Sequence, residues 1–143
     1  MKILLLGANG QVGWELQRSL APLGQMKAYD RHALDLGNFE SLRACVRDHR
    51  PEVIVNAAAY TAVEKAESEH DKANRINAEA VAILADEAKQ LNACLIHYST
   101  DYVFDGTKSN AYLETDETNP QSVYAKTKLQ GEEAIKMSEC NHL

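Results

Sequence analysis

The sequence predicts an α/β fold, in which a doubly wound and mostly parallel sheet forms the middle of three α/β/α layers. Two observations support this fold class. Short apolar segments alternate with segments of helical periodicity along the whole 143 residues. The apolar segments are continuous rather than alternating with polar residues, which is typical of parallel strands covered on both faces. The length suits one domain, over residues 1–143.

The expected elements follow one another as strand and helix. Apolar runs predict strands over 3–6, 26–30, 53–55 and from 94 onward, with a very short one over 33–36. Helical spacing predicts helices over 12–23, 39–49, 70–91 and 121–137, the second one capped by Asn38. We expect residues 64–67 to be solvated helix surface and 107–119 to be a polar loop. The chain is expected to stop at Leu143, before the final strand of the sheet begins.

Charge and composition argue against several classes of protein. Lys and Arg number 15 against 21 Asp and Glu, a net charge of −6, and this acidic balance argues against nucleic-acid and membrane-surface binding. The apolar runs are far shorter than the ~20 residues that span a bilayer. No metal-ligand spacing occurs, and Cys45, Cys94 and Cys140 form no CxxC pair. We therefore expect reduced thiols in a cytoplasmic protein.

A glycine-rich loop follows the first strand directly. Gly7, Gly10 and Gly13 lie in the segment GANGQVG, which opens the first helix. Glycine lets the backbone turn tightly and approach a pyrophosphate, and the N-terminus of the helix offers free N–H groups. A strand before the loop and a helix after it are the context that this motif requires. The loop predicts a Rossmann-like dinucleotide-binding site, and a tight turn without a ligand is the alternative.

Two further segments extend the predicted cofactor site. Asp30 ends the second strand, where a carboxylate accepts hydrogen bonds from the adenosine ribose. Arg31 beside it suits a 2′-phosphate, so NADH and NADPH are not separated, and a solvated Asp-Arg turn is the alternative. The loop at Asp35 and Leu36 is placed to cover the adenine. The alanines of 57–59 follow a buried strand, where small side chains leave room for a cofactor or for close helix packing.

Three residues form a candidate catalytic triad. Tyr124 and Lys128 lie four residues apart at the start of the last helix, so both side chains lie on one face. A nearby ammonium lowers the pKa of a phenol and suits it to acid–base catalysis. Thr100 follows a buried strand, where its hydroxyl is placed to polarise a carbonyl near the tyrosine. A solvated Tyr-Lys helix face is the alternative. His97, on the same strand, is expected to be a satisfied core histidine.

Four segments give the chain a resemblance to a known family. They are GANGQVGWELQ at 7–17, VIVNAAAYTAVEKAE at 53–67, STDYVFDG at 99–106 and VYAKTKLQGE at 123–132. With them the chain resembles the extended short-chain dehydrogenases/reductases and, among these, the dTDP-4-dehydrorhamnose reductase group. The resemblance implies NADPH or NADH as cofactor and a nucleotide-sugar substrate, in the synthesis of a cell-surface polysaccharide precursor. Some members of the family form dimers or use a divalent cation.

The resemblance also implies a role for each site residue. On the cofactor it implies phosphate contacts for Gly10, Gln11 and Val12, the ribose for Asp30, the adenine for Asp35 and Leu36, and the nicotinamide half for Ala59, Tyr60 and Thr61. At the substrate it implies that Thr100 holds the 4-keto oxygen beside Asp101. Tyr124 would donate the proton and Lys128 would bind the nicotinamide ribose. Asn77 falls where many members have an asparagine that supports a proton relay, or is simply a polar residue at the edge of a helix stripe.

The chain departs from the family in length. Members are roughly twice as long, and their second half supplies a final strand and the sugar-nucleotide lobe, so we expect this chain to bind dinucleotide weakly and to reduce nothing alone. Two other functions stay open. One is a nucleotide-sugar epimerase or dehydratase with the same triad. The other is a regulatory subunit without catalysis, like the β subunit of methionine adenosyltransferase.

Overall fold

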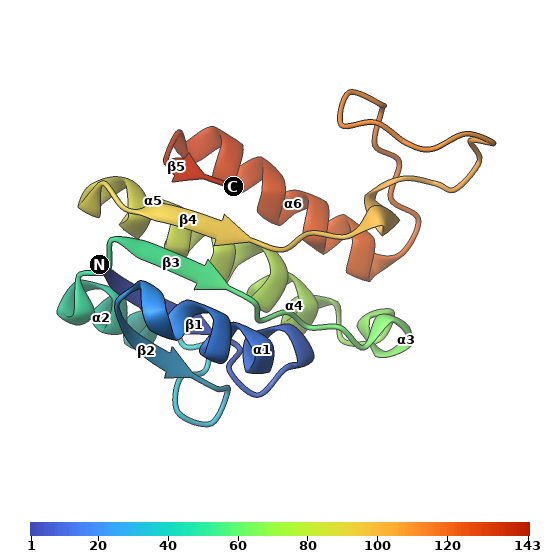
Figure 1. The fold of residues 1–143 in the computed structure, drawn as a ribbon. Coiled ribbons are helices and arrows are strands. Elements are labelled where there is room, and N and C mark those ends of the chain that lie inside the picture. Colours follow the sequence, from blue (N-terminus) through green and yellow to red (C-terminus); the bar gives the residue numbers. More distant parts are fainter.

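The computed structural model describes residues 1–143 and has five strands in one sheet, in the order β2-β1-β3-β4-β5 (Figure 1). The strands are β1 Lys2–Leu6, β2 Gln25–Tyr29, β3 Val53–Asn56, β4 Cys94–His97 and β5 Asn141–His142. Each pair of neighbours is parallel. The strand order reverses between β1 and β3, which is the mark of a doubly wound sheet. The predicted α/β fold class is confirmed.

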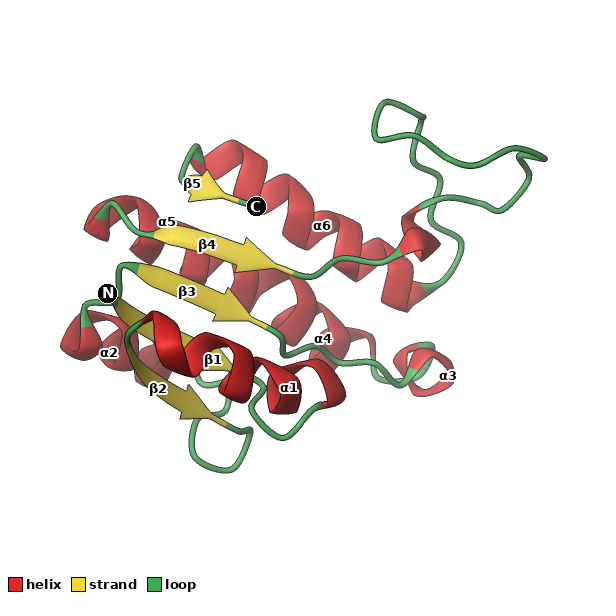
Figure 2. Cartoon of the chain, in the orientation of Figure 1, coloured by secondary structure: helices red, strands yellow, loops and turns green.

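Six helices connect and cover the strands (Figure 2). They are α1 Gln11–Leu20, α2 Phe39–His49, α3 Val63–Ala66, α4 His70–Asn74, α5 Ala80–Leu91 and α6 Val123–Ser138. Helix α1 lies on one face of the sheet, whereas α2, α5 and α6 lie on the other. Asn38 caps α2 as expected, because its side chain accepts the N–H of Ser41 at 3.1 Å. No helix combines the length and the apolar character needed to cross a membrane.

The core has two parts, one on each face of the sheet. Side chains alternate along a strand, so Leu4 and Leu6 of β1 join the larger cluster under α2, α5 and α6. Ile3 and Leu5 point the other way and pack with Leu16 and other residues of the α1 side. All four β1 side chains are at most 2% exposed. This burial on both faces explains why the strand is continuously apolar.

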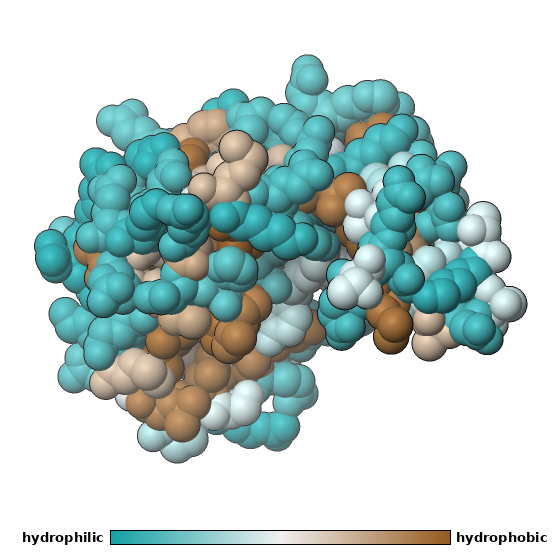
Figure 3. Space-filling model, turned by 90° about the horizontal axis from the view of Figure 1, so that it is seen from above, coloured by the Kyte–Doolittle hydropathy of each residue, from teal (hydrophilic) through white to brown (hydrophobic).

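The face that carries α1 is only partly covered. Helix α1 packs beside β1, and Val53 of β3 and Ile96 of β4 remain half-buried at the margin of the smaller cluster. Seen from above, the surface is mainly hydrophilic, with a hydrophobic patch on the side that α1 occupies (Figure 3). The two faces therefore differ: three long helices cover one, and a single helix covers the other.

The short strand expected over 33–36 is absent. Instead the chain turns, with the Leu34 N–H donating to the Asp30 carbonyl and the Asn38 N–H to the Asp35 carbonyl, both at 2.9 Å. Leu34 and Leu36 are buried in the larger cluster without forming a strand. The apolar character of this segment comes from packing under the turn, which hydrophobicity alone does not distinguish from a short strand.

The expectation that the chain stops before its next strand was wrong. Helix α6 ends at Ser138, and the next residue, Glu139, has a left-handed φ of 57° at which the chain reverses. Asn141 then pairs with Cys94 in register, and the Leu143 N–H donates to the Leu95 carbonyl at 3.0 Å. The last residues thus extend the sheet beyond β4.

Candidate functional site

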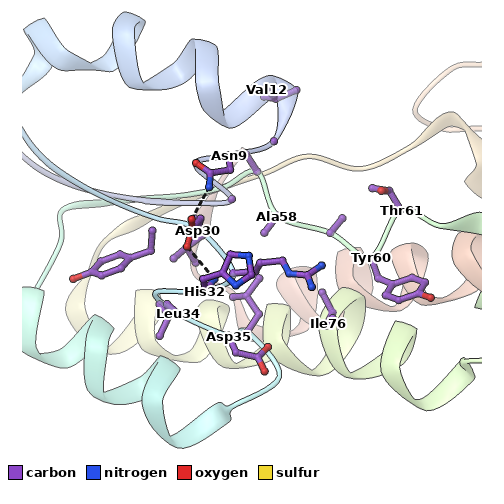
Figure 4. Close-up of a pocket in the computed structure, with 18 of the residues that line it drawn as sticks. Asn9, Val12, Asp30, His32, Leu34, Asp35, Ala58, Tyr60, Thr61 and Ile76 are labelled. Carbon is purple, nitrogen blue, oxygen red and sulfur yellow. Dashed lines mark hydrogen bonds between the residues drawn. The ribbon is translucent and has the colours of Figure 1, made fainter.

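The largest cavity described lies at the carboxyl ends of β1, β2 and β3 and has a volume of about 1100 Å³. These ends meet where the strand order reverses, which is where doubly wound sheets bind their ligands. The cavity is lined by the glycine loop after β1, the turn after β2, the loop after β3 and one face of the helix that begins with α4 (Figure 4). Three loops and one helix face, distant in sequence, therefore build one cavity.

The glycine loop is shaped by close contacts that admit no side chain. Gly7 has a φ of +84°, and a Cβ atom there would lie 2.7 Å from the backbone nitrogen of Ala58. A Cβ on Gly13 would collide with the carbonyl of Gly7, so helix α1 can pack directly on the loop only with glycine at this position. Gly10 is exposed, and a Cβ atom there would meet only the Gly7 carbonyl, at 3.3 Å. The first and third glycines therefore serve the fold, and the second leaves the backbone open to the cavity.

Helix α1 begins at this loop without a cap. Gly10 is the N-cap residue and offers no side-chain hydrogen bond to the first turn, in which no acidic residue is present. Gln11 and Val12 of this turn line the cavity. Unpaired N–H groups and the partial positive charge of a helix N-terminus suit a pyrophosphate. The open loop and the uncapped helix thus fit a dinucleotide.

Asp30 lies at the end of β2, on the floor of the cavity. Its Oδ1 accepts the N–H groups of His32 and Ala33, each at 2.9 Å. Its Oδ2 accepts a hydrogen bond from Nδ2 of Asn9 at 2.5 Å. The backbone N–H of Ala33 is the main cause that lowers the pKa of Asp30, with His32 and Asn9 acting in the same direction. The carboxylate is therefore ionised and joins the turn after β2 to the glycine loop.

The loop after β3 is held in place by a buried asparagine. Asn77 is 1% exposed, and its Oδ1 accepts the Tyr60 N–H at 2.8 Å while its Nδ2 donates to the Tyr60 carbonyl at 3.1 Å. The same Nδ2 donates to the hydroxyl of Thr127 in α6, also at 3.1 Å. All polar atoms of Asn77 are thus engaged with the protein. The proton-relay role that the family resemblance implies for Asn77 stays a prediction.

Most of the predicted cofactor residues line this cavity. They are Gly7, Gly10, Gln11, Val12, Asp30, Asp35, Leu36, Ala59, Tyr60 and Thr61. Gly13 does not, because it is buried in α1 against the backbone of Gly7. Sequence reasoning missed Asn9, His32, Leu34, Lys72 and Ile76, which also line the cavity. The spacing of four between Lys72 and Ile76 was the one available signal, since it places both on one helix face.

Lys128 belongs to a second cluster, outside this cavity. Its side chain is 2% exposed, and its Nζ lies 3.1 Å from Nε2 of His97 and 2.5 Å from the carbonyl oxygen of Tyr98. Burial lowers the pKa of Lys128 to about 8, and Glu132 partly opposes this shift. The amine is therefore poised to exchange a proton near neutral pH.

His97 connects Lys128 to the end of β3. The buried Asn56 accepts the Ala58 N–H through Oδ1, so its Nδ2 meets Nδ1 of His97, at 3.1 Å. A ring that accepts at Nδ1 carries its proton on Nε2, toward Lys128, and it can donate that proton only to the neutral amine, which predominates above the lysine pKa of about 8. Burial, with a smaller contribution from Lys128, lowers the pKa of His97 to about 3. His97 is thus satisfied, as expected, but its partner is a predicted catalytic residue.

The other predicted catalytic residues lie near one another without direct bonds. Thr100 and Asp101 follow β4, and Tyr124 lies in the first turn of α6. The ring of Tyr124 meets that of Tyr102 edge-on, with centroids 6.2 Å apart, which brings the two segments together. The Thr100 hydroxyl contacts only its own turn, accepting the Tyr102 N–H at 3.3 Å and donating to Asp101 at 3.4 Å. No hydrogen bond joins Tyr124 to Thr100 or Lys128 in this structure.

Two groups hold the start of α6, and with it Tyr124. Ser122 caps the helix by accepting the Ala125 N–H at 3.2 Å, and Glu67 accepts the Val123 N–H at 2.8 Å. Glu64, Lys65 and Glu67 are exposed, as expected, and Glu67 in addition binds the start of α6. Its carboxylate caps a helix that lies far away in sequence, and an anion is favourable at that position.

The loop before α6 is ordered by one carboxylate. Asp105 accepts hydrogen bonds from the N–H and hydroxyl of Thr107, from the hydroxyl of Tyr112 and from the amide of Asn119. These bonds hold the pKa of Asp105 well below its usual range, the Thr107 N–H contributing most. The segment projects beyond the carboxyl ends of the strands (Figure 1). It is thus an ordered arm beside Thr100 and Tyr124.

A cavity of this shape, with a glycine loop, an uncapped helix and a carboxylate at the end of β2, defines the class: a Rossmann-like nucleotide-binding domain. Tyr124 and Lys128 at the start of α6 add the sequence pattern of a short-chain dehydrogenase/reductase. More narrowly, the chain belongs to the family described as "RmlD substrate binding domain", whose sequence model matches residues 1–143.

Curated relatives and solved structures agree with this family. The chain is 56% identical over 135 residues to a dTDP-4-dehydrorhamnose reductase of Burkholderia thailandensis, with 94% of this chain and 45% of the relative covered. It is 52% identical to the Escherichia coli reductase of the same name, covering 100% of this chain and 49% of that one. The chain thus spans about half the length of these relatives.

Two solved structures are similar over nearly the whole chain. A dTDP-4-dehydrorhamnose reductase of Clostridium acetobutylicum is 41% identical with a TM-score of 0.95, over 99% of this chain and 51% of that one. The reductase of Bacillus anthracis, in complex with NADP, is 34% identical with a TM-score of 0.93, over 99% and 50%. A UDP-glucose 4-epimerase of Thermus thermophilus, in complex with NAD, has a TM-score of 0.85 at 20% identity and shares the fold.

Proposed function

We propose that this chain is the dinucleotide-binding part of an NAD(P)H-dependent reductase that converts the 4-keto group of dTDP-4-dehydrorhamnose into the hydroxyl of dTDP-L-rhamnose. The observation that carries the proposal is the cavity in which the glycine loop meets the uncapped start of α1. The names of relatives that are 52% and 56% identical support the choice of substrate.

The chain's own residues suit the binding of the cofactor. The N–H groups of Gln11 and Val12, beside Gly10, would hold the pyrophosphate, and Asp30 would face the ribose. Asp35 and Leu36 would lie at the adenine, and Ala59, Tyr60 and Thr61 along the nicotinamide half. When bound, the reduced nicotinamide supplies the hydride, which is chemistry that no side chain provides.

The catalytic roles fall to the residues of β4 and α6. Thr100 would hold the keto oxygen beside Asp101, and the Tyr124 hydroxyl would deliver the proton to the forming alkoxide. Lys128, with its pKa lowered to about 8, would assist Tyr124 and bind the nicotinamide ribose once it turns from the Tyr98 carbonyl. This requires a rearrangement of Lys128, because no hydrogen bond joins it to Tyr124 in the structure.

We infer that substrate binding needs the second half of the relatives' length as well. The relatives are about twice as long, and we place the sugar-nucleotide lobe in their second half. We infer that this chain binds dinucleotide but turns over no keto sugar alone. For the full-length protein we propose a cytoplasmic location, a nucleotide-sugar substrate and a homodimer.

Calorimetric titration of the chain with NADH and with NADPH tests the proposal. We expect both to bind in the cavity, and Asp30→Ala to weaken NADH binding about threefold to tenfold, because one ribose hydrogen bond and the turn after β2 are lost. Asp86→Ala, an exposed carboxylate on α5, is the matched control and should leave both affinities unchanged. Undiminished binding by Asp30→Ala would remove the ribose assignment.

A turnover assay compares the 143-residue chain with a chain of the relatives' full length. The 143-residue chain should consume no NADPH with dTDP-4-dehydrorhamnose, whereas a chain of the relatives' full length should. Measurable consumption by the 143 residues alone contradicts the inference that turnover needs the full length of the relatives. A full-length protein that reduces no keto sugar but copurifies with a synthetase supports the regulatory-subunit alternative instead.

A further inference from the structure

The hydrogen bonds of Asp30 leave little of its carboxylate for a ligand. A carboxylate has about four acceptor positions, two on each oxygen. Both positions on Oδ1 are taken by the N–H groups of His32 and Ala33, at 2.9 Å each. On Oδ2, one position is taken by Nδ2 of Asn9 at 2.5 Å (Figure 4). One acceptor position on Oδ2 therefore remains.

This occupancy limits how Asp30 can bind a ribose. An adenosine ribose with free 2′- and 3′-hydroxyls presents two donors, and a carboxylate with both oxygens free can accept both. Asp30 can accept only one of them while Asn9 holds Oδ2. The site therefore makes fewer hydrogen bonds to a ribose with a free 2′-hydroxyl, and its preference for that ribose over one with a 2′-phosphate is smaller.

The surroundings of Asp30 suit a phosphate at the same place. Arg31 and His32 are exposed and line the cavity next to Asp30. Asn9 lies in the glycine loop, and its Nδ2 carries a second hydrogen that the protein does not use. A guanidinium and an amide N–H are both donors to a phosphate. The charge of Asp30 opposes a phosphate, but three N–H donors already direct their hydrogens at that carboxylate.

We propose that Asn9 determines how this site discriminates between dinucleotides with a 2′-phosphate and those with a free 2′-hydroxyl, by holding Oδ2 of Asp30 while Arg31 faces the 2′ position. The inference rests on the proposed dinucleotide binding and concerns a residue of the glycine loop outside the glycines themselves. Asn9 is a specificity-determining residue in this account. Asp30 supplies the acceptor oxygens, and the hydrogen bond from Asn9 determines how many acceptor positions on Oδ2 are free for a ligand.

The substitution Asn9→Ala therefore has opposite effects on the two cofactors. It frees the second position on Oδ2, so the ribose of NADH gains an acceptor. It also removes a donor from the 2′ position and leaves more of the Asp30 charge exposed to a phosphate. We expect the ratio of the NADPH to the NADH dissociation constant to rise about threefold to tenfold, which is the value of one hydrogen bond.

Calorimetry on the full 143-residue chain measures this ratio, with 2′,5′-ADP and 5′-AMP as probes of the adenosine half alone. Asn9→Leu keeps the side-chain size without the hydrogen bond and should shift the ratio in the same direction as Asn9→Ala. Arg31→Ala should weaken NADPH and 2′,5′-ADP while leaving NADH and 5′-AMP unchanged. Asn110→Ala, exposed on the projecting loop, is the matched control and should shift nothing.

The outcomes separate this inference from the proposed function. If the wild-type chain binds both dinucleotides and the Asn9 variants keep the wild-type ratio, or move it toward NADPH, the role of Asn9 is wrong and dinucleotide binding stands. If the wild-type chain binds neither dinucleotide, the proposed function fails and this inference fails with it. Equal thermal unfolding midpoints for wild type and Asn9→Leu show that the loop is intact.

Discussion

Lys128 and His97 form a buried pair of bases at the end of β4. A lysine that is 2% exposed carries a desolvation penalty when charged, and this lowers its pKa to about 8. The neighbouring imidazole stays neutral over most of the acid range, because its own pKa falls to about 3. The pair therefore carries at most one positive charge between those two pKa values.

The pair predicts how stability depends on pH. The pKa of His97 is lowered from 6.5 to about 3, so between these values the unfolded chain binds the proton and the folded chain does not. Keeping His97 neutral therefore costs no stability above pH 6.5. Below that pH the free energy of unfolding falls as the pH drops towards 3. The slope from this group approaches about 1.4 kcal/mol per pH unit.

Urea denaturation at a series of pH values measures that slope. His97→Phe, which cannot titrate, should lose less stability per pH unit than wild type between pH 6 and pH 4, even if it is less stable at pH 7. The exposed His70 provides a control, since His70→Gln should keep the wild-type slope. Identical slopes for His97→Phe and wild type would show that His97 titrates normally in the folded chain.

At the scale of elements, the contact between α6 and the helix of 70–91 decides the geometry of the site. Sequence periodicity predicts one continuous helix there, and the structure has α4 and α5 joined by a π-helical turn over Arg75–Glu79. Such turns often occur at functional sites. Asn77 lies in this turn and bonds both the Tyr60 backbone and Thr127 of α6. The turn thus links the cofactor loop to the helix of Tyr124 and Lys128.

Gly131 makes this contact possible. It lies inside α6, where glycine ordinarily destabilises a helix by about 0.5–1 kcal/mol relative to alanine. A Cβ at this position would collide with the backbone carbonyl of Asn77. We therefore expect Gly131→Ala to destabilise the chain by about 2 kcal/mol, the reverse of its effect on an isolated helix.

Urea denaturation of Gly131→Ala shows whether the substitution lowers or raises the free energy of unfolding. Gln130→Ala, an exposed neighbour in the same helix, is the control and should change the free energy of unfolding by less than about 0.5 kcal/mol. If Gly131→Ala is more stable than wild type, α6 and the π-helical turn can move apart at no cost. The close contact would then contribute nothing to the free energy of unfolding.

At the scale of the whole molecule, one buried carboxylate joins two helices of the layer behind the sheet. Glu87 of α5 is 1% exposed and accepts hydrogen bonds from Arg47 at 2.6 and 2.8 Å and from Arg43 at 2.9 Å. Both arginines belong to α2. The hydrogen bonds of Arg47 are the main cause that lowers the pKa of Glu87. A charged group in this position is tolerated only because both arginines meet it.

We expect Glu87→Gln to destabilise the chain by about 2 kcal/mol, because charge-assisted hydrogen bonds become neutral ones. The lowered pKa means that the wild-type contribution is present above the usual glutamate pKa and is lost as the pH falls below it. Thermal unfolding at pH 7 and at pH 3 measures both effects, with the exposed neighbour substitution Asp86→Asn as control. A difference between wild type and Glu87→Gln that persists undiminished at pH 3 would contradict the electrostatic explanation.

Local features of the site could be predicted from the sequence. The glycine loop, the strands and the acidic end of β2 all follow from patterns within about ten residues, and the structure places them in one cavity. Asn9 and Ile76 could not be assigned in this way, because nothing in their local sequence says that they face the same space. His97 is half-buried and has polar partners at both ring nitrogens, but its contact with Lys128 joins β4 to α6 and depends on their packing.

Local sequence patterns were enough to predict the alternation of strands and helices, the parallel sheet and the position of the glycine loop, because backbone periodicity and glycine conformations are local properties. Tertiary packing brings Asn9 to Asp30, Asn77 to the Tyr60 backbone and Asn141 into a strand beside Cys94. Each of these contacts joins segments far apart in the chain. Strand order and helix packing bring such segments together, and a single sequence does not contain the distances between them.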